Sequence, residues 1–355
     1  KEGLIEEVLS DKPRIDYTDS LTSPSFLLEP QRTNEITYSE DISTYINFGS
    51  TDDINVAISP DGSQNASSFE GNGAYNQALL ASPSMTLASA GSHTISVFAK
   101  KGTNNFMQLF ADGFTGASNT EAYFDLENGT TPTSGANIED YGSGWYRCST
   151  TVTIDSGDLT GRISVRITPS TSGSFWSPNS ANVGKSVFVY GFQMEAGSYA
   201  TSYIPTDGST VTRVQETCVG AGNASTFNDS EGVLYAEIAA LANDGTKRRI
   251  AISDGTNDNR IVLGYFTDNS IQSFGSVITS QFNLFDTSSN INLFNKCAIK
   301  YKQNDFALWV NGVEVATYTS GNTPTGLNQI SIDDGAGADN FYGNVKAVAV
   351  FKEAL

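Results

Sequence analysis

Apolar and polar residues alternate along most of this chain, with the two-residue period of strands that bury one face. Residues 162–168 are a clear case, because Ile163, Val165 and Ile167 share one side and polar residues occupy the other. Runs of this kind predict strands at 94–100, 105–111, 122–126, 145–154, 162–168, 185–195, 233–240, 249–253, 260–266, 296–302, 306–310, 313–318, 329–333 and 344–351. The run at 185–195 is apolar on both faces at its centre, which predicts a central strand.

Short polar turns separate these runs. Asn128-Gly129 follows one run, and Asn311-Gly312 joins two others with the pattern of a tight hairpin. Many short strands joined by Gly, Asn and Asp turns indicate a β-sandwich or barrel. Apolar residues have helical spacing only in residues 3–9, which predicts one short helix.

The alternation lapses twice, and the lapses suggest domain boundaries. A proline-containing polar segment follows the helix candidate and ends near Pro30, and residues 206–226 are rich in Gly, Ser and Thr. We therefore predict an N-terminal helical or extended segment at 1–30, followed by two β-sandwich domains at 31–214 and 215–355. A chain of 355 residues is long enough to form two separate cores.

Charge and cysteine usage narrow the choice of partners. The chain has 39 acidic and 20 basic residues, for a formal net charge of −19, so phosphate backbones and anionic membrane surfaces would be repelled. There is no run of about 18 apolar residues, so we expect no membrane insertion. The three cysteines cannot all pair with one another, and Cys148 and Cys297 fall on apolar strand faces. We expect reduced thiols and folding in a reducing cytoplasm.

The first domain resembles a carbohydrate-binding-module-like jelly roll that is common in bacteriophage tail-fibre and other virion structural proteins. The strings that carry the resemblance are PRIDY at 13–17, LLEPQRTN at 27–34, YSED at 38–41, VFAKKG at 97–102, GWYR at 144–147, QMEAG at 193–197, ATSYIPT at 200–206 and Thr212-Arg213. Together they cover about residues 12–214. They are specific for the module type and say little about its ligand.

The second domain resembles a laminin-G or concanavalin-A-like jelly roll. The resemblance rests on EGVLYAE at 231–237, LWVNGVEV at 308–315 and FYGNV at 341–345. The two resemblances imply an all-β chain of two tandem jelly-roll β-sandwiches. This fold is shared by lectins, adhesion modules and hydrolases, so it does not by itself define a function.

The sequence offers little for catalysis. Its one histidine, His93, follows a Gly-Ser turn at a strand start, where we expect a surface position. No G-x-S-x-G string occurs, and the counts of His and Cys exclude zinc sites built from several of them. Glycoside hydrolysis needs only two carboxylates. In residues 237–240, however, alanine stands where hydrolases of the concanavalin type carry their second acid. We predict a protein that is not an enzyme.

Exposed aromatic residues are the candidates for binding carbohydrate, since aromatic faces pack against the C–H faces of sugars. Phe175 and Trp176 lie in a loop of small residues, where a large aromatic pair is costly to expose unless it folds back or meets a partner. Trp309 alternates with Leu308 and Val310 and so could face outward or pack on the sheet. Trp145 belongs, by the resemblance, to the framework of the module.

Calcium is the one cofactor that the sequence suggests. Asp333, Asp334 and Asp339 surround glycines in a loop of the second domain. Carboxylates and backbone carbonyls of such a loop could bind Ca²⁺. The alternative is a solvated acidic turn, since the spacing is not that of an EF-hand.

The favoured hypothesis is a phage virion structural protein, such as a tail fibre or head fibre, assembled in the bacterial cytoplasm and exposed on the particle. It would attach to host cell-surface polysaccharide and contact other virion proteins. The family resemblance implies a homotrimer, whose copies would add avidity. Two alternatives stay open: a secreted bacterial carbohydrate-binding or adhesin fragment of a polysaccharide-degrading protein, and a purely structural assembly or decoration subunit.

Overall fold

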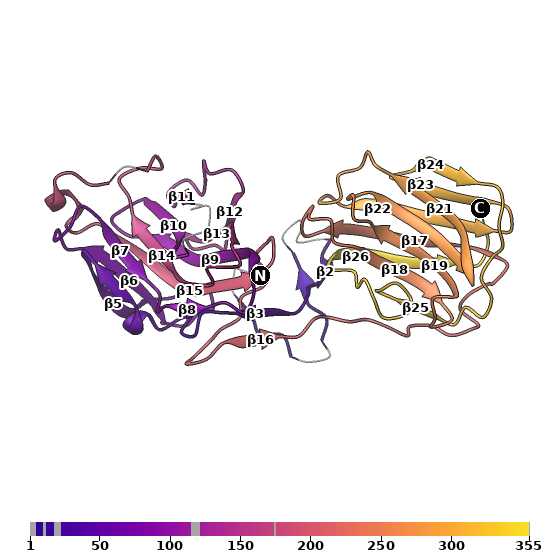
Figure 1. Cartoon of the computed structure of the whole chain (residues 1–355), viewed down its shortest axis with the longest axis horizontal. Coiled ribbons are helices and arrows are strands. Elements are labelled where there is room, and N and C mark those ends of the chain that lie inside the picture. Colours follow the sequence, from indigo (N-terminus) through magenta and orange to yellow (C-terminus); the bar gives the residue numbers. More distant parts are fainter. Residues whose placement is uncertain (1–4, 10–11, 18–22, 115–120, 174, 355) are drawn as a thin grey trace. The chain divides into compact units, whose positions relative to one another are not determined.

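The computed structural model describes residues 5–9, 12–17, 23–114, 121–173 and 175–354 (Figure 1). Within these residues the chain is all-β, with two short 3₁₀ turns, η1 (Ile42–Thr44) and η2 (Asn179–Asn182), and no α-helix. It divides into two compact units. The first contains residues 1–7 and 31–214, and the second contains residues 8–30 and 215–355.

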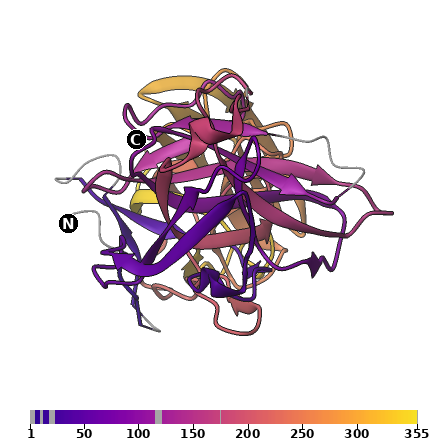
Figure 2. The ribbon, with the colours of Figure 1, turned by 90° about the vertical axis from the view of Figure 1, so that its left-hand side faces the viewer.

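The first unit is an antiparallel β-sandwich (Figures 1 and 2). One sheet has the order β11 (Ala122–Asp125), β10 (Phe106–Asp112), β14 (Thr160–Ile167), β7 (Ala78–Ala81) and β4 (Ile46–Phe48), with β8 (Met85–Thr86) also paired to β14. The other has the order β12 (Ala136–Asp140), β13 (Trp145–Ile154), β9 (Gly91–Lys101), β15 (Ser186–Ala196), β6 (Ala66–Gly71) and β5 (Ser50–Ala57). A separate ribbon pairs β3 (Arg32–Asn34) with β16 (Val211–Arg213).

Strand alternation produces the core of this unit. Ile163, Val165 and Ile167 of β14 are all buried and face the opposite sheet, as the two-residue period predicts. Strand β15 is apolar on both faces because it lies between β9 and β6 and is covered on each side. Its predicted central position is confirmed.

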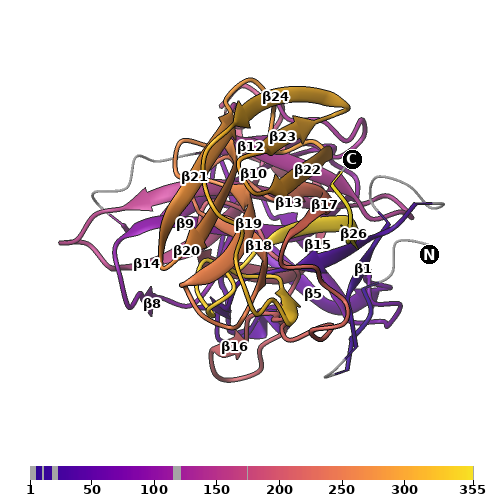
Figure 3. The ribbon, with the colours of Figure 1, turned by 90° about the vertical axis from the view of Figure 1, so that its right-hand side faces the viewer.

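The second unit is also an antiparallel sandwich (Figure 3). Its larger sheet has the order β1 (Ile15–Asp16), β2 (Ser25–Leu28), β26 (Gly343–Phe351), β17 (Glu231–Ala240), β22 (Asn295–Lys302), β23 (Phe306–Val310) and β24 (Val313–Tyr318). The smaller one has the order β21 (Thr279–Asp286), β20 (Ile271–Val277), β19 (Asn259–Tyr265), β18 (Arg248–Ser253) and β25 (Gln329–Ser331). Asn311 and Gly312 have φ values of +52° and +85°, so the predicted hairpin between β23 and β24 is confirmed.

The prediction of a short helix at 3–9 is wrong for the part that the structure describes. Residues 5–9 are not helical. The Ile5 amide donates instead to the Pro60 carbonyl (2.8 Å), and its side chain packs on a cluster that includes Phe98, Trp145 and Tyr190. One turn of helix gains too few hydrogen bonds to offset the entropy of nucleation, so these contacts decide the conformation.

The rest of the predicted 1–30 segment does not form a separate body. Strand β2 pairs with β26, with Phe26 opposite Val345, and β1 pairs with β2. Strands β1 and β2 thus extend the larger sheet of the second unit. Among the described residues, no helix has the length and apolar character needed to cross a membrane.

Candidate functional site

The structure places Phe175 on the outer face of a sheet in the first unit. The Phe175 side chain is 49% exposed, and the guanidinium carbon of Arg166 lies 4.8 Å from its ring centroid. The same guanidinium lies 4.7 Å from the ring centroid of Phe110. Stacking on a cation holds an aromatic ring that would otherwise be free to move. We refer to Phe110, Arg166 and Phe175 as the Arg166 stack.

A row of polar side chains continues from the Arg166 stack across the sheet. Arg166 Nη1 donates to Gln108 Oε1 (2.6 Å), and Gln108 Nε2 donates to the Tyr123 hydroxyl (2.7 Å). That hydroxyl donates in turn to Glu121 Oε2 (3.1 Å). Burial, together with the nearby Glu121 carboxylate, raises the pKa of Tyr123 to about 12. The phenol therefore keeps its proton at neutral pH, and the whole row has one fixed hydrogen-bond direction.

Strand register explains why these side chains meet. Leu109 and Val165 point into the core, so Gln108 and Arg166 point outward. Gln108 lies opposite Arg166 on one side and opposite Tyr123 on the other. Adjacent strands thus present Arg166, Gln108 and Tyr123, and Glu121 lies directly before β11.

Trp176 lies beside Phe175 in sequence and is less exposed. Its indole Nε1 is buried and has no hydrogen-bond partner among the described residues, and the same holds for Ser164 Oγ on β14. Buried donors normally have a partner, in protein or in ordered water. Trp176 and Ser164 therefore each retain a buried polar atom that the described chain does not satisfy.

The second unit presents its own aromatic surface. Trp309 faces outward on β23 and is 40% exposed, and it lies directly opposite Ala298 on β22. Tyr235 on β17 lies opposite Ala298 from the other side. A small residue therefore separates two aromatic side chains, with Lys296 and Lys300 as the neighbours of Ala298 on the same face.

The acidic loop of the second unit is neutralised from within. Asp334 forms an ion pair with Arg260 (2.8 Å) and accepts hydrogen bonds from the amides of Ala336 and Ala338. Asp339 forms an ion pair with Arg249 (2.8 Å).

Asp333, the third predicted ligand, accepts a hydrogen bond from the Gly335 amide (2.6 Å). In the part of the chain that the structure describes, no three His, Cys, Asp or Glu side chains are grouped to hold a metal ion. The geometry does not support the predicted calcium site, because two of its carboxylates are already paired with arginines.

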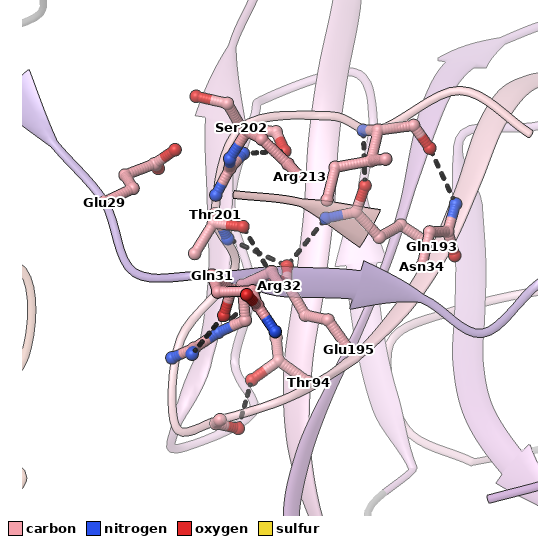
Figure 4. A network of polar contacts seen from close by, with 12 residues as sticks. Glu29, Gln31, Arg32, Asn34, Thr94, Gln193, Glu195, Thr201, Ser202 and Arg213 are labelled. Carbon is pink, nitrogen blue, oxygen red and sulfur yellow. Dashed lines mark hydrogen bonds and ion pairs between the residues drawn. The ribbon is translucent and has the colours of Figure 1, made fainter. Parts of the chain in front are cut away.

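Three of the strings quoted for the first domain, at 27–34, 193–197 and 200–206, have a structural role that the sequence did not reveal (Figure 4). Glu195 is fully buried, and Gln193 Nε2 and the Thr201 amide donate to its Oε1 (2.7 and 2.8 Å). Thr201 Oγ1 donates to its other oxygen, and Arg32 Nε lies 3.7 Å away. These residues join the start of the first sandwich to its end, so the three strings that contain them contribute to the fold.

The histidine prediction is wrong, because His93 is buried and not on the surface. It lies in β9, which is paired on both sides, opposite Val152 and Ala196. Its Nδ1 is 3.1 Å from the Gly91 carbonyl oxygen. A histidine held inside a sheet in this way is not available to activate a nucleophile.

The sequence did not indicate that the carboxylates of Glu40 and Asp61 lie close together. The Tyr190 hydroxyl lies 2.9 Å from Glu40 Oε1 and 3.0 Å from Asp61 Oδ2. Asn65 Nδ2 is within hydrogen-bond distance of both acids. Residues far apart in sequence build this cluster, and their hydrogen bonds to one another indicate a structural link between the 38–41 and 59–65 segments.

No protein-family model matches this chain, and no curated protein matches it. Among solved structures, the chain is similar to the CBM40 of the Ruminococcus gnavus IT-sialidase, bound to α2,3-sialyllactose. The identity is 16% and the TM-score 0.33, and the match covers 39% of this chain and 91% of that one. It is also similar to the Caenorhabditis elegans galectin LEC-6, with 14% identity and a TM-score of 0.29 over 38% of this chain and 91% of that one.

Domains LG4-5 of the mouse laminin α1 chain match at 11% identity and a TM-score of 0.28, over 75% of this chain and 84% of that one. The strand topology described above defines the chain as an all-β protein of two antiparallel sandwiches.

Proposed function

We propose that this chain is a non-catalytic glycan-binding protein and that its first unit binds sugar at the Arg166 stack. The observation that carries the proposal is the half-exposed Phe175 ring, fixed on the Arg166 guanidinium. A sugar ring would pack its C–H face on the free side of this ring. Because the ring is already ordered, binding would cost little side-chain entropy.

The neighbouring polar row supplies the hydrogen bonds that a sugar needs. Glu121 is exposed at the end of the row, and its carboxylate can accept hydrogen bonds from sugar hydroxyls. The Trp309 surface of the second unit is a candidate for a second contact with the same polymer. Two weak contacts in one chain raise the apparent affinity through effective concentration.

We further propose that the protein is displayed on a phage particle, as part of a tail fibre, head fibre or similar appendage, and attaches to host cell-surface polysaccharide. The support is the resemblance of the strings in the first unit to virion modules. A homotrimer and contacts with other virion proteins follow from the same resemblance. The alternatives are a secreted bacterial adhesin fragment and a purely structural decoration subunit.

The experiment is binding of the purified chain to an array of bacterial and algal polysaccharides, with and without a calcium chelator. We expect selective binding that chelation leaves unchanged, because arginines neutralise the acidic loop. Absence of binding across a broad array, by protein shown to be folded, would contradict the proposal and favour the decoration subunit.

A further inference from the structure

The first unit contains a pocket that the sequence analysis did not identify. Its volume is about 170 Å³, and it lies between the segment that follows β3 and the residues around β8. The lining includes Glu35, Thr37, Ser84, Met85, Thr86 and Thr210. A cavity needs only about 10–15 Å³ on this measure to hold one water, so the pocket has room for one small ring.

Glu35 is the one charged residue of the pocket lining. Its backbone amide donates to the Met194 carbonyl (2.8 Å), which fixes the backbone at this position. Its carboxylate forms no hydrogen bond or ion pair with any residue that the structure describes. Burial raises the pKa of Glu35 above its usual value, so desolvation of this carboxylate is not offset by a partner.

The remaining lining has the mixed character of a sugar site. Ser84 Oγ donates to the Gly161 carbonyl (3.4 Å), and the Thr86 hydroxyl pairs with that of Thr160 (3.0 Å), so both side chains have defined orientations. Met85 adds an adaptable apolar wall. An unpartnered carboxylate accepts two hydrogen bonds, and adjacent hydroxyls of a sugar ring can donate both.

We infer that the Glu35 pocket is a second saccharide subsite, which holds one sugar ring through hydrogen bonds from adjacent ring hydroxyls to the Glu35 carboxylate. The inference rests on the proposed function. Because the pocket has room for one small ring, we assign it a terminal residue or a single-residue branch of the glycan. A divalent cation is a poorer occupant, because Ca²⁺ takes six to eight oxygen ligands and the pocket offers one carboxylate.

The test is saturation-transfer NMR of the full chain with a panel of methyl glycosides, followed by titration of any that bind. We expect at least one glycoside to bind the unaltered protein, and Glu35→Gln to weaken that binding at least tenfold. Glu70→Gln, an exposed acid of β6 in the same unit, is the matched control and should change affinity less than twofold. Ser84→Leu puts a larger side chain in the pocket lining and leaves the Glu35 residue itself unchanged, and it should weaken binding as strongly.

Binding measurements on Phe175→Ala beside the two pocket variants, and calorimetry with Ca²⁺, separate this inference from the proposed function. If Phe175→Ala abolishes polysaccharide binding while Glu35→Gln and Ser84→Leu leave both polysaccharide and glycoside binding unchanged, the pocket inference is overturned and the proposed function stands. If Glu35→Gln and Ser84→Leu lose glycoside binding while Phe175→Ala retains it, the pocket is supported on its own. If the unaltered protein binds no glycoside and no polysaccharide, both are overturned. Calorimetric binding of Ca²⁺ that Glu35→Gln removes, without sugar binding, would also overturn the inference.

Discussion

Replacement of Asn34 by alanine should destabilise the first unit more than a typical single substitution does. Asn34 is fully buried in β3 and makes four hydrogen bonds with the backbone. Its Nδ2 donates to the carbonyls of Phe192 (3.1 Å) and Ile204 (2.9 Å). Its Oδ1 accepts from the amides of Ile36 and Met194, both at 3.1 Å.

The magnitude follows from these bonds. Four bonds at about 1 kcal/mol each imply that Asn34→Ala should lower the free energy of unfolding by at least about 4 kcal/mol. Buried backbone groups left without a partner add a desolvation penalty to this value. For a unit of this size, 1 kcal/mol corresponds to roughly 2–4 °C in Tm, so the first unit should melt about 10 °C lower. Asn34→Asp keeps the volume but replaces both donors with an oxygen, so we expect at least as large a loss.

Differential scanning calorimetry is the assay, because two compact units allow two resolved transitions. Only the transition of the first unit should move. Asn137→Ala, which removes an exposed hydrogen bond to Glu139, is the control and should shift Tm by less than about 1–2 °C. A loss below about 1 kcal/mol for Asn34→Ala, or an equal shift of both transitions, would refute the reasoning.

Three further outcomes follow from the packing. Burial raises the pKa of Cys148 well above its usual value and that of Cys297 to about 12. Iodoacetamide should therefore alkylate only the exposed Cys218 in the native protein, and all three thiols after unfolding. Mass spectrometry measures the number of modified thiols. Gly264→Ala should destabilise the second unit by about 2 kcal/mol in denaturant titrations, because a Cβ there would overlap the backbone of β18. Arg260→Met should destabilise the second unit by about 3 kcal/mol, because it leaves the Asp334 carboxylate without its ion pair. Added calcium should leave the Tm of the unaltered second unit unchanged, and a rise in that Tm would contradict the arginine pairing.

Local pattern predicted the strands from β9 onward except β12, β16, β20 and β21, because a sheet that buries one face leaves a two-residue signal in the sequence. It missed β1 to β8. The alternation of β14 and the turn at Asn311 and Gly312 are both read from neighbouring residues. The helix expected at 3–9 shows the limit of this reasoning. Its few apolar residues fit a helical period, but the contacts of Ile5 with residues distant in sequence decide the conformation.

The site was only partly predictable for the same reason. The small-residue loop around Phe175 indicated an aromatic side chain with no local partner, and the alternation of β14 could place Arg166 on an outer face. Their stacking depends on how the loop returns over the sheet. For the acidic loop, the local sequence suggested a metal site that the structure does not support. Asp334 is paired with Arg260, 74 positions earlier, and no local pattern shows that pairing.

The central claim is that Phe175, held on Arg166, is a sugar-binding platform. The most direct measurement is isothermal titration calorimetry of the best polysaccharide ligand with Phe175→Ala. The control is Phe285→Ala, which removes a phenylalanine of similar exposure from the second unit. Loss of one aromatic contact of about 1–2 kcal/mol predicts a five- to thirtyfold weaker Kd for Phe175→Ala. The control should bind like the unaltered protein. Equal affinity for all three proteins would contradict the account.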